Sequence, residues 1–76
     1  MPTPDELREI IVGLLADGAG GEAKRWRDVV GKVRSLALAA NVRSNWSVDP
    51  RGSEGELVVV QRAVKIVRAE HPHVSG

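Results

Sequence analysis

The carboxylates in the first third of the chain are the first side chains that acid–base chemistry could use. They are spread along one amphipathic segment and its exit: Asp5, Glu6, Glu9, Asp17 and Glu22. A catalytic pair needs a cleft that shifts its pKa values, and these positions mostly lie opposite an apolar stripe, where water solvates them. The chain has no cysteine, and its serines show no meaningful spacing to a histidine. We therefore expect a protein that is not an enzyme.

Near the C-terminus, Glu70-His71-Pro72-His73 brings two imidazoles and a carboxylate together. A structural zinc site needs four ligands held by an ordered backbone. This segment follows the last predicted helix and contains a proline, so the sequence predicts a flexible tail over residues 71–76. We expect no metal, no cofactor and no small-molecule substrate.

The remaining chemical signal is charge. Residues 1–23 hold one basic and five acidic residues, whereas residues 24–51 hold seven basic and two acidic ones. A helix, a glycine turn and a basic helix superficially match a helix-turn-helix. The candidate nucleic-acid contacts are Lys24, Arg25, Arg27, Arg34, Arg43 and Arg51. The acidic first helix and a net charge of only +1 weaken this hypothesis, because nucleic-acid binders are usually strongly basic.

Three helices are predicted to carry these side chains. Thr3-Pro4-Asp5-Glu6 is a capping box, and Gly18 is a typical stop, so a first helix is expected over residues 4–17. Apolar residues at helical spacing from Trp26 to Ala40 predict a second helix over residues 22–40. Residues 41–52 lack periodicity and predict a long loop that carries Trp46, whose indole we expect in the core more readily than at a ligand.

The third predicted helix, residues 54–70, begins at a second capping box formed by Ser53 and Glu56, and Pro72 stops it. Its apolar arc covers about half the circumference, so we expect two elements to pack on it. A rival interpretation reads Leu57 to Val60 as a strand that pairs with residues 45–48. The helical interval between the polar positions favours one continuous helix.

The predicted fold is all-α: a compact three-helix domain over residues 1–70 with a long tryptophan-bearing loop between the second and third helices. With 76 residues, the chain is near the lower limit for a self-supporting core. No apolar run is long enough to span a membrane and acidic residues precede the apolar run at Ile10, so we expect a soluble, cytoplasmic protein.

The function that this pattern favours is a non-catalytic interaction module that binds another protein or itself, with a homodimer as one form. Apolar residues outside the predicted stripes, together with the loop tryptophan, are its candidate interface: Val12, Leu38, Trp46 and Val58. Weak nucleic-acid binding through the basic face of the second helix is the alternative. The identity of a partner does not follow from the residues.

Overall fold

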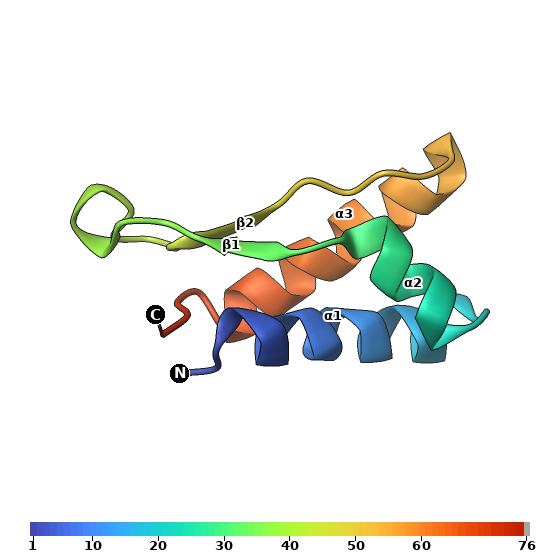
Figure 1. Ribbon diagram of the computed structural model, residues 1–76, viewed down its shortest axis with the longest axis horizontal. Coiled ribbons are helices and arrows are strands. Elements are labelled where there is room, and N and C mark those ends of the chain that lie inside the picture. Colours follow the sequence, from blue (N-terminus) through green and yellow to red (C-terminus); the bar gives the residue numbers. More distant parts are fainter. Residues whose placement is uncertain (76) are drawn as a thin grey trace.

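The computed structural model describes residues 1–75 and shows a mainly helical domain with a small β-hairpin (Figure 1). In chain order the elements of this part are α1 (Pro4–Ala19), α2 (Ala23–Val30), β1 (Val33–Ser35), the short 3₁₀ turn η1 (Leu38–Ala40), β2 (Trp46–Val48) and α3 (Glu54–Glu70). Three helices were predicted and three are found, but the hairpin means that the fold is not purely all-α.

Both long helices start where the sequence predicts. The Thr3 side chain accepts a hydrogen bond from the Glu6 amide, and the Glu6 carboxylate accepts one from the Thr3 amide. Ser53 and Glu56 form the same reciprocal pair at the start of α3. The single helix over residues 54–70 is confirmed, so the strand interpretation of Leu57 to Val60 is wrong.

The middle of the chain differs from the prediction. The expected helix over residues 22–40 ends at Val30, because Gly31 adopts a φ of +68° and its amide donates to the Arg27 carbonyl. Only glycine takes up this left-handed conformation at low cost. The apolar residues beyond Gly31 kept a helical spacing, but Val33 belongs to a strand and not to a helix.

The hairpin also occupies part of the predicted loop. Strands β1 and β2 are antiparallel, with Val33 opposite Val48 and Ser35 opposite Trp46. Residues near 45–48 therefore do form a strand, but their partner is β1 and not the valine run of α3. The hairpin extends along the molecule and projects past the ends of α1 and α3, with η1 at its tip (Figure 1).

One layer of the fold contains α1 and α3, which run in roughly opposite directions, and α2 with the hairpin covers one side of that layer (Figure 1). The core lies between the layers. Its fully buried side chains are Trp46, Leu7, Ile11, Leu15, Val12, Val29, Val30, Val60 and Val67. Trp46 is the largest of them, which confirms that the loop tryptophan closes over the core.

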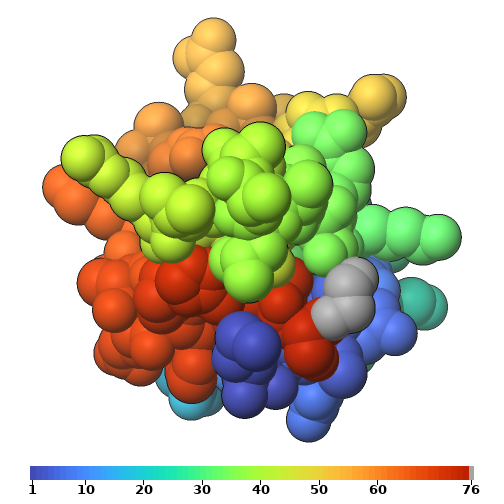
Figure 2. Space-filling view, turned by 90° about the vertical axis from the view of Figure 1, so that its left-hand side faces the viewer, coloured from blue at the N-terminus to red at the C-terminus, as the bar shows by residue number. Residues whose placement is uncertain are grey.

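The C-terminal segment, predicted as a flexible tail, lies against this core over residues 71–75. The buried Asn45 side chain donates to the Val74 carbonyl and accepts from the Val74 amide, and the Trp46 indole donates to the His71 carbonyl. Val74 itself is buried. Figure 2 shows this segment beside the N-terminus and below the hairpin tip, and the Ser75 amide donates to the Pro2 carbonyl. The prediction missed these contacts because they join residues distant in sequence; Gly76 lies outside the described residues.

Within residues 1–75, no helix combines the length and the apolar character needed to cross a bilayer.

Candidate protein-interaction surface

The four residues predicted as an interface do not form one patch. Val12 and Trp46 are each 1% exposed and belong to the core. Leu38 and Val58 are 53% and 52% exposed, but Leu38 belongs to η1 and Val58 to the first two turns of α3. The hairpin tip and the start of α3 lie toward opposite ends of the long axis (Figure 1). The prediction that Val12 lies outside the core is wrong, because α1 packs against α2 and β1 as well as against α3.

An apolar groove does exist between the C-terminal half of α1 and the middle of α3. Both helices contribute to its lining: Leu14, Leu15, Gly18, Ala19, Val59, Arg62, Ala63 and Ile66. Leu15 and Ala63 form its buried floor, and Ile66 is 51% exposed. The groove lies on the layer of α1 and α3 and is not covered by any element of residues 1–75.

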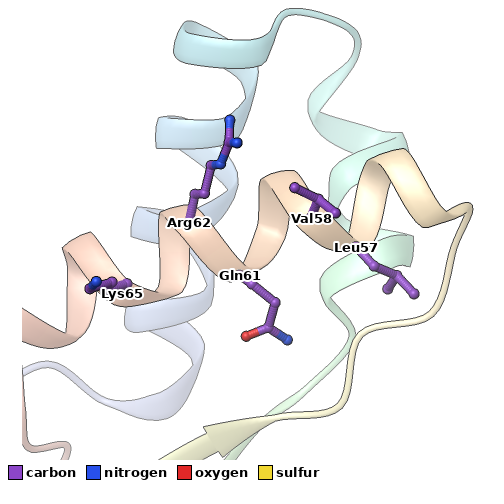
Figure 3. A pocket seen from close by; sticks show the side chains of 5 residues that line it. All are labelled: Leu57, Val58, Gln61, Arg62 and Lys65. Carbon is purple, nitrogen blue, oxygen red and sulfur yellow. The ribbon is translucent and has the colours of Figure 1, made fainter.

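This apolar surface continues around α3. A second hollow, almost entirely apolar, is lined by Leu57, Val58, Gln61, Arg62 and Lys65. Figure 3 shows Leu57 and Gln61 projecting from one side of the helix and Val58 and Arg62 from the other. Arg62 lines both hollows. We call the first hollow, which lies between the two helices, the α1–α3 groove.

The sequence signal for this groove was the wide apolar arc of α3. The prediction assigned two packed elements to that arc, and the structure supplies α1 on one flank and α2 with the hairpin over the buried side. The sequence could not show that the remaining flank, with Val58 and Ile66, would stay exposed. Helical spacing gives the width of an apolar arc but not the number of neighbours that cover it.

Two of the three predicted nucleic-acid contacts on α2 are occupied by carboxylates. Arg27 donates from Nε and Nη2 to Glu9 of α1, with the shortest contact at 2.8 Å, and Arg25 makes the same kind of pair with Glu56 of α3, also at 2.8 Å. Acidic α1 and basic α2 thus face each other. The positive charges of two of the six predicted nucleic-acid contacts, Arg25 and Arg27, are therefore partly neutralised by carboxylates.

These pairs also shift the acidity of the carboxyls. The hydrogen bonds from Arg25, and then the one from the Ser53 amide, lower the pKa of Glu56 to about 2. Hydrogen bonds from Arg27 lower the pKa of Glu9. Both carboxyls are therefore ionised at neutral pH and already bonded to arginine, which is the arrangement of structural ion pairs.

The other predicted nucleic-acid contacts are distributed over several elements. Lys24 is on α2, Arg34 is on β1 beside Ser47, and Arg43 lies in the hairpin loop, all exposed. Arg51 follows β2, with its guanidinium 3.8 Å from the Asp49 carboxylate. The structure does not gather these six residues on the face of a single recognition helix.

The histidines of the C-terminal segment take part in backbone packing. The His71 carbonyl accepts the Trp46 indole N–H, and the His73 ring Nε2 lies 2.7 Å from the Val42 carbonyl. Among residues 1–75, no group of three or more histidine, aspartate or glutamate side chains is placed to hold a metal ion.

Comparisons with protein-family models, with curated proteins and with solved structures found no match to this chain.

Proposed function

We propose that this chain is a small, non-catalytic protein-interaction module and that its docking surface is the α1–α3 groove. The observation that carries the proposal is an apolar surface that the rest of the described chain leaves uncovered. A fold of this size gains stability from every apolar side chain that it buries. Exposed, contiguous apolar surface on such a domain is typical of a binding site for another protein.

The composition of the groove supports a protein partner. Its lining is aliphatic and includes one arginine, Arg62, and arginine is enriched at protein interfaces while most other charged residues are depleted. The groove is also shallow and open along its outer side, whereas small-molecule sites usually enclose most of their ligand. A partner helix laid along the groove would bury the exposed sides of Val59 and Ile66.

The rigidity of the surface supports the same function. Both helices that form the groove begin with complete capping boxes. Their side chains are held on regular backbone, so the surface needs little reordering before a partner binds, and the entropic cost of association is reduced.

Weak nucleic-acid binding remains the alternative proposal, and it has less support. Arg25 and Arg27 would have to leave the carboxylates of Glu56 and Glu9 before they could contact phosphates. We also propose a cytoplasmic location, since a chain without cysteine suits a reducing compartment.

Affinity capture with matched variants tests the proposed function. The bait is the tagged chain, and the prey is a lysate that also contains an untagged copy. Ile66→Glu places a charge in the groove, whereas Leu38→Glu places it at the hairpin tip, where the native side chain is equally exposed, 53% against 51%.

A bound protein, foreign or a second copy, that is lost with Ile66→Glu and retained with Leu38→Glu supports the proposal. The proposal fails if every captured protein binds both variants equally, or if nothing binds the unmodified bait. Far-UV circular dichroism of both variants shows that each is folded.

A further inference from the structure

We infer that the partner of the α1–α3 groove is a second copy of this chain, in a symmetric dimer whose twofold axis runs parallel to the groove. The inference rests on the proposed function and specifies the occupant of the same surface. Two features lead to it: the groove has rims of opposite charge, and Arg62, on the basic rim, makes no hydrogen bond or ion pair within the described chain.

The rim on the α1 side is acidic. Glu6, Ile10, Leu14 and Asp17 follow one another at intervals of four, four and three residues, so they lie along one side of the helix. Leu14 of this row lines the groove, and Ile10 is 37% exposed. The exposed carboxylate of Asp17 therefore flanks the groove, and Glu6 lies on the same side of α1 about three turns nearer its N-terminus.

The rim on the α3 side is basic. Val58, Arg62 and Lys65 follow at intervals of four and three residues and line the second hollow on α3, and Arg62 also lines the groove. Arg62 and Lys65 are both exposed. An apolar strip thus lies between a negative rim on one helix and a positive rim on the other.

Symmetry decides what such a surface fits. In a face-to-face dimer, a twofold axis parallel to the groove places α1 of one copy over α3 of its partner, so each acidic rim meets a basic rim. A twofold axis across the groove places α1 over α1 and sets the acidic rims against each other. Because an isologous interface must be self-complementary, the charges favour the first arrangement.

The same operation pairs two particular side chains. Arg62 lines the groove together with Leu14 and Gly18, and Asp17 directly precedes Gly18 in α1. Rotation about a twofold axis along the groove leaves the position of each residue along that axis unchanged. Arg62 of one copy therefore lies opposite Asp17 of the other. Within residues 1–75, Arg62 makes no hydrogen bond or ion pair, and neither does Arg43 of the hairpin loop, whereas Arg25, Arg27 and Arg68 do.

The available surface suits a reversible dimer. At 1.5 Å per residue, α1 and α3 are about 24 Å and 26 Å long, and a face two helices wide has a flat area of about 500 Å². A standard interface takes about 800 Å² from each partner, roughly a sixth of the 4882 Å² surface of this chain. The dimer therefore belongs to the smaller interfaces, with a Kd in the micromolar range.

Sedimentation equilibrium of the full chain tests the dimer. We expect mainly monomer at about 1 μM and a substantial dimer fraction at about 100 μM. Ile66→Glu should raise the Kd at least about tenfold, while Leu38→Glu should leave it unchanged. A chain that stays monomeric up to about 1 mM overturns the inference, and so does a dimer that Ile66→Glu does not weaken.

An exchange of charges tests the symmetry. The symmetric dimer contains two contacts between residue 17 of one copy and residue 62 of the other. Asp17→Arg makes both residues of each contact positive, and Arg62→Glu makes both negative. Each variant alone should therefore dimerise at least about tenfold more weakly. In an equimolar mixture of the two variants, each contact of the heterodimer again joins a positive and a negative side chain. Native mass spectrometry, which separates the variants by mass, should show the heterodimer as the dominant dimer.

If the mixture shows no preference for the heterodimer, the inferred arrangement is wrong. The preference is specific to the dimer, because a contact between Asp17 and Arg62 within one chain would not favour the heterodimer. Failure of this inference is distinct from failure of the proposed function. A monomeric chain that still captures a foreign protein through Ile66 retains the function and loses the dimer.

Discussion

The two faces of α3 show what distinguishes a closed surface from an open one. On the covered face, the Arg68 guanidinium lies 4.0 Å from the centre of the Trp46 ring and donates to the Trp46 carbonyl and to the Ser44 hydroxyl. On the open face, six residues earlier, Arg62 lies among aliphatic side chains without a bonded partner in the described chain. The same residue type thus closes one face and stays available on the other.

The difference lies in what surrounds each arginine. The covered face has the one large aromatic side chain of the hairpin and several directional hydrogen bonds, which fix the hairpin and the C-terminal segment to α3. The open face has aliphatic side chains and charges, which gain contacts only when another surface arrives. Substitutions on the covered face should therefore reduce stability, and those on the open face should change binding instead.

Removal of the central aromatic side chain should have the largest effect. Trp46→Ala should lower the free energy of unfolding by about 3–5 kcal/mol, because it leaves a cavity under the hairpin. It also removes the indole N–H that holds the His71 carbonyl. Ile66→Ala on the open face should change the same quantity by less than about 0.5 kcal/mol. Denaturant unfolding followed by far-UV circular dichroism measures both, and losses of similar size would contradict the distinction.

The two arginines give a smaller, matched comparison. Arg68→Ala should lower the free energy of unfolding by about 1–2 kcal/mol, because it removes a cation–π contact and two hydrogen bonds. Arg62→Ala should leave it within about 0.5 kcal/mol of the unmodified chain. The same unfolding measurement applies. If Arg62→Ala is as destabilising as Arg68→Ala, then Arg62 has a structural role within the monomer.

The smallest expected effect concerns the ion pair that joins the start of α3 to α2, and it depends on pH. The pKa of Glu56 is lowered to about 2 in the folded chain from an ordinary value of 4.5. Its contribution to stability is therefore complete above about pH 4.5 and is lost as the pH falls toward 2.

Glu56→Gln should accordingly lower the Tm at pH 7 by a few degrees, and the difference from the unmodified chain should shrink as the pH falls below about 4.5. Thermal unfolding at several pH values measures it, with Glu54→Gln in the same helical turn as the control. A Tm difference that stays constant from pH 7 to pH 2 would show that the carboxylate charge is not involved.

Local sequence signals predicted the start of α1 and both ends of α3. Capping boxes are contacts between residues three apart, and a proline after a helix acts within one turn, so neither depends on the rest of the fold. The break at Gly31 was a local signal too. The prediction did not use it and followed the apolar spacing from Trp26 to Ala40, which over so few residues fits either a helix or a helix followed by a buried strand.

The remaining features depend on contacts between distant parts of the chain. Pairing of residues 33–35 with 46–48, the burial of Val12 and the docking of Val74 on Asn45 each join segments that sequence periodicity treats separately. The candidate site has the same origin. Exposed apolar residues such as Val58 could be listed in advance, but the groove exists only because α1 and α3 lie side by side.

The most direct measurement of the groove as a binding surface is a dilution series of amide NMR spectra from about 1 mM to about 20 μM, a range that brackets a micromolar Kd. We expect concentration-dependent shifts of the amide signals of Leu14, Gly18, Val59 and Ile66, and constant positions for those of residues 38–42 at the hairpin tip. Shifts confined to the hairpin tip would contradict a binding surface in the groove. So would spectra that stay constant over the whole dilution series, if the groove signals also fail to shift when a captured partner protein is added.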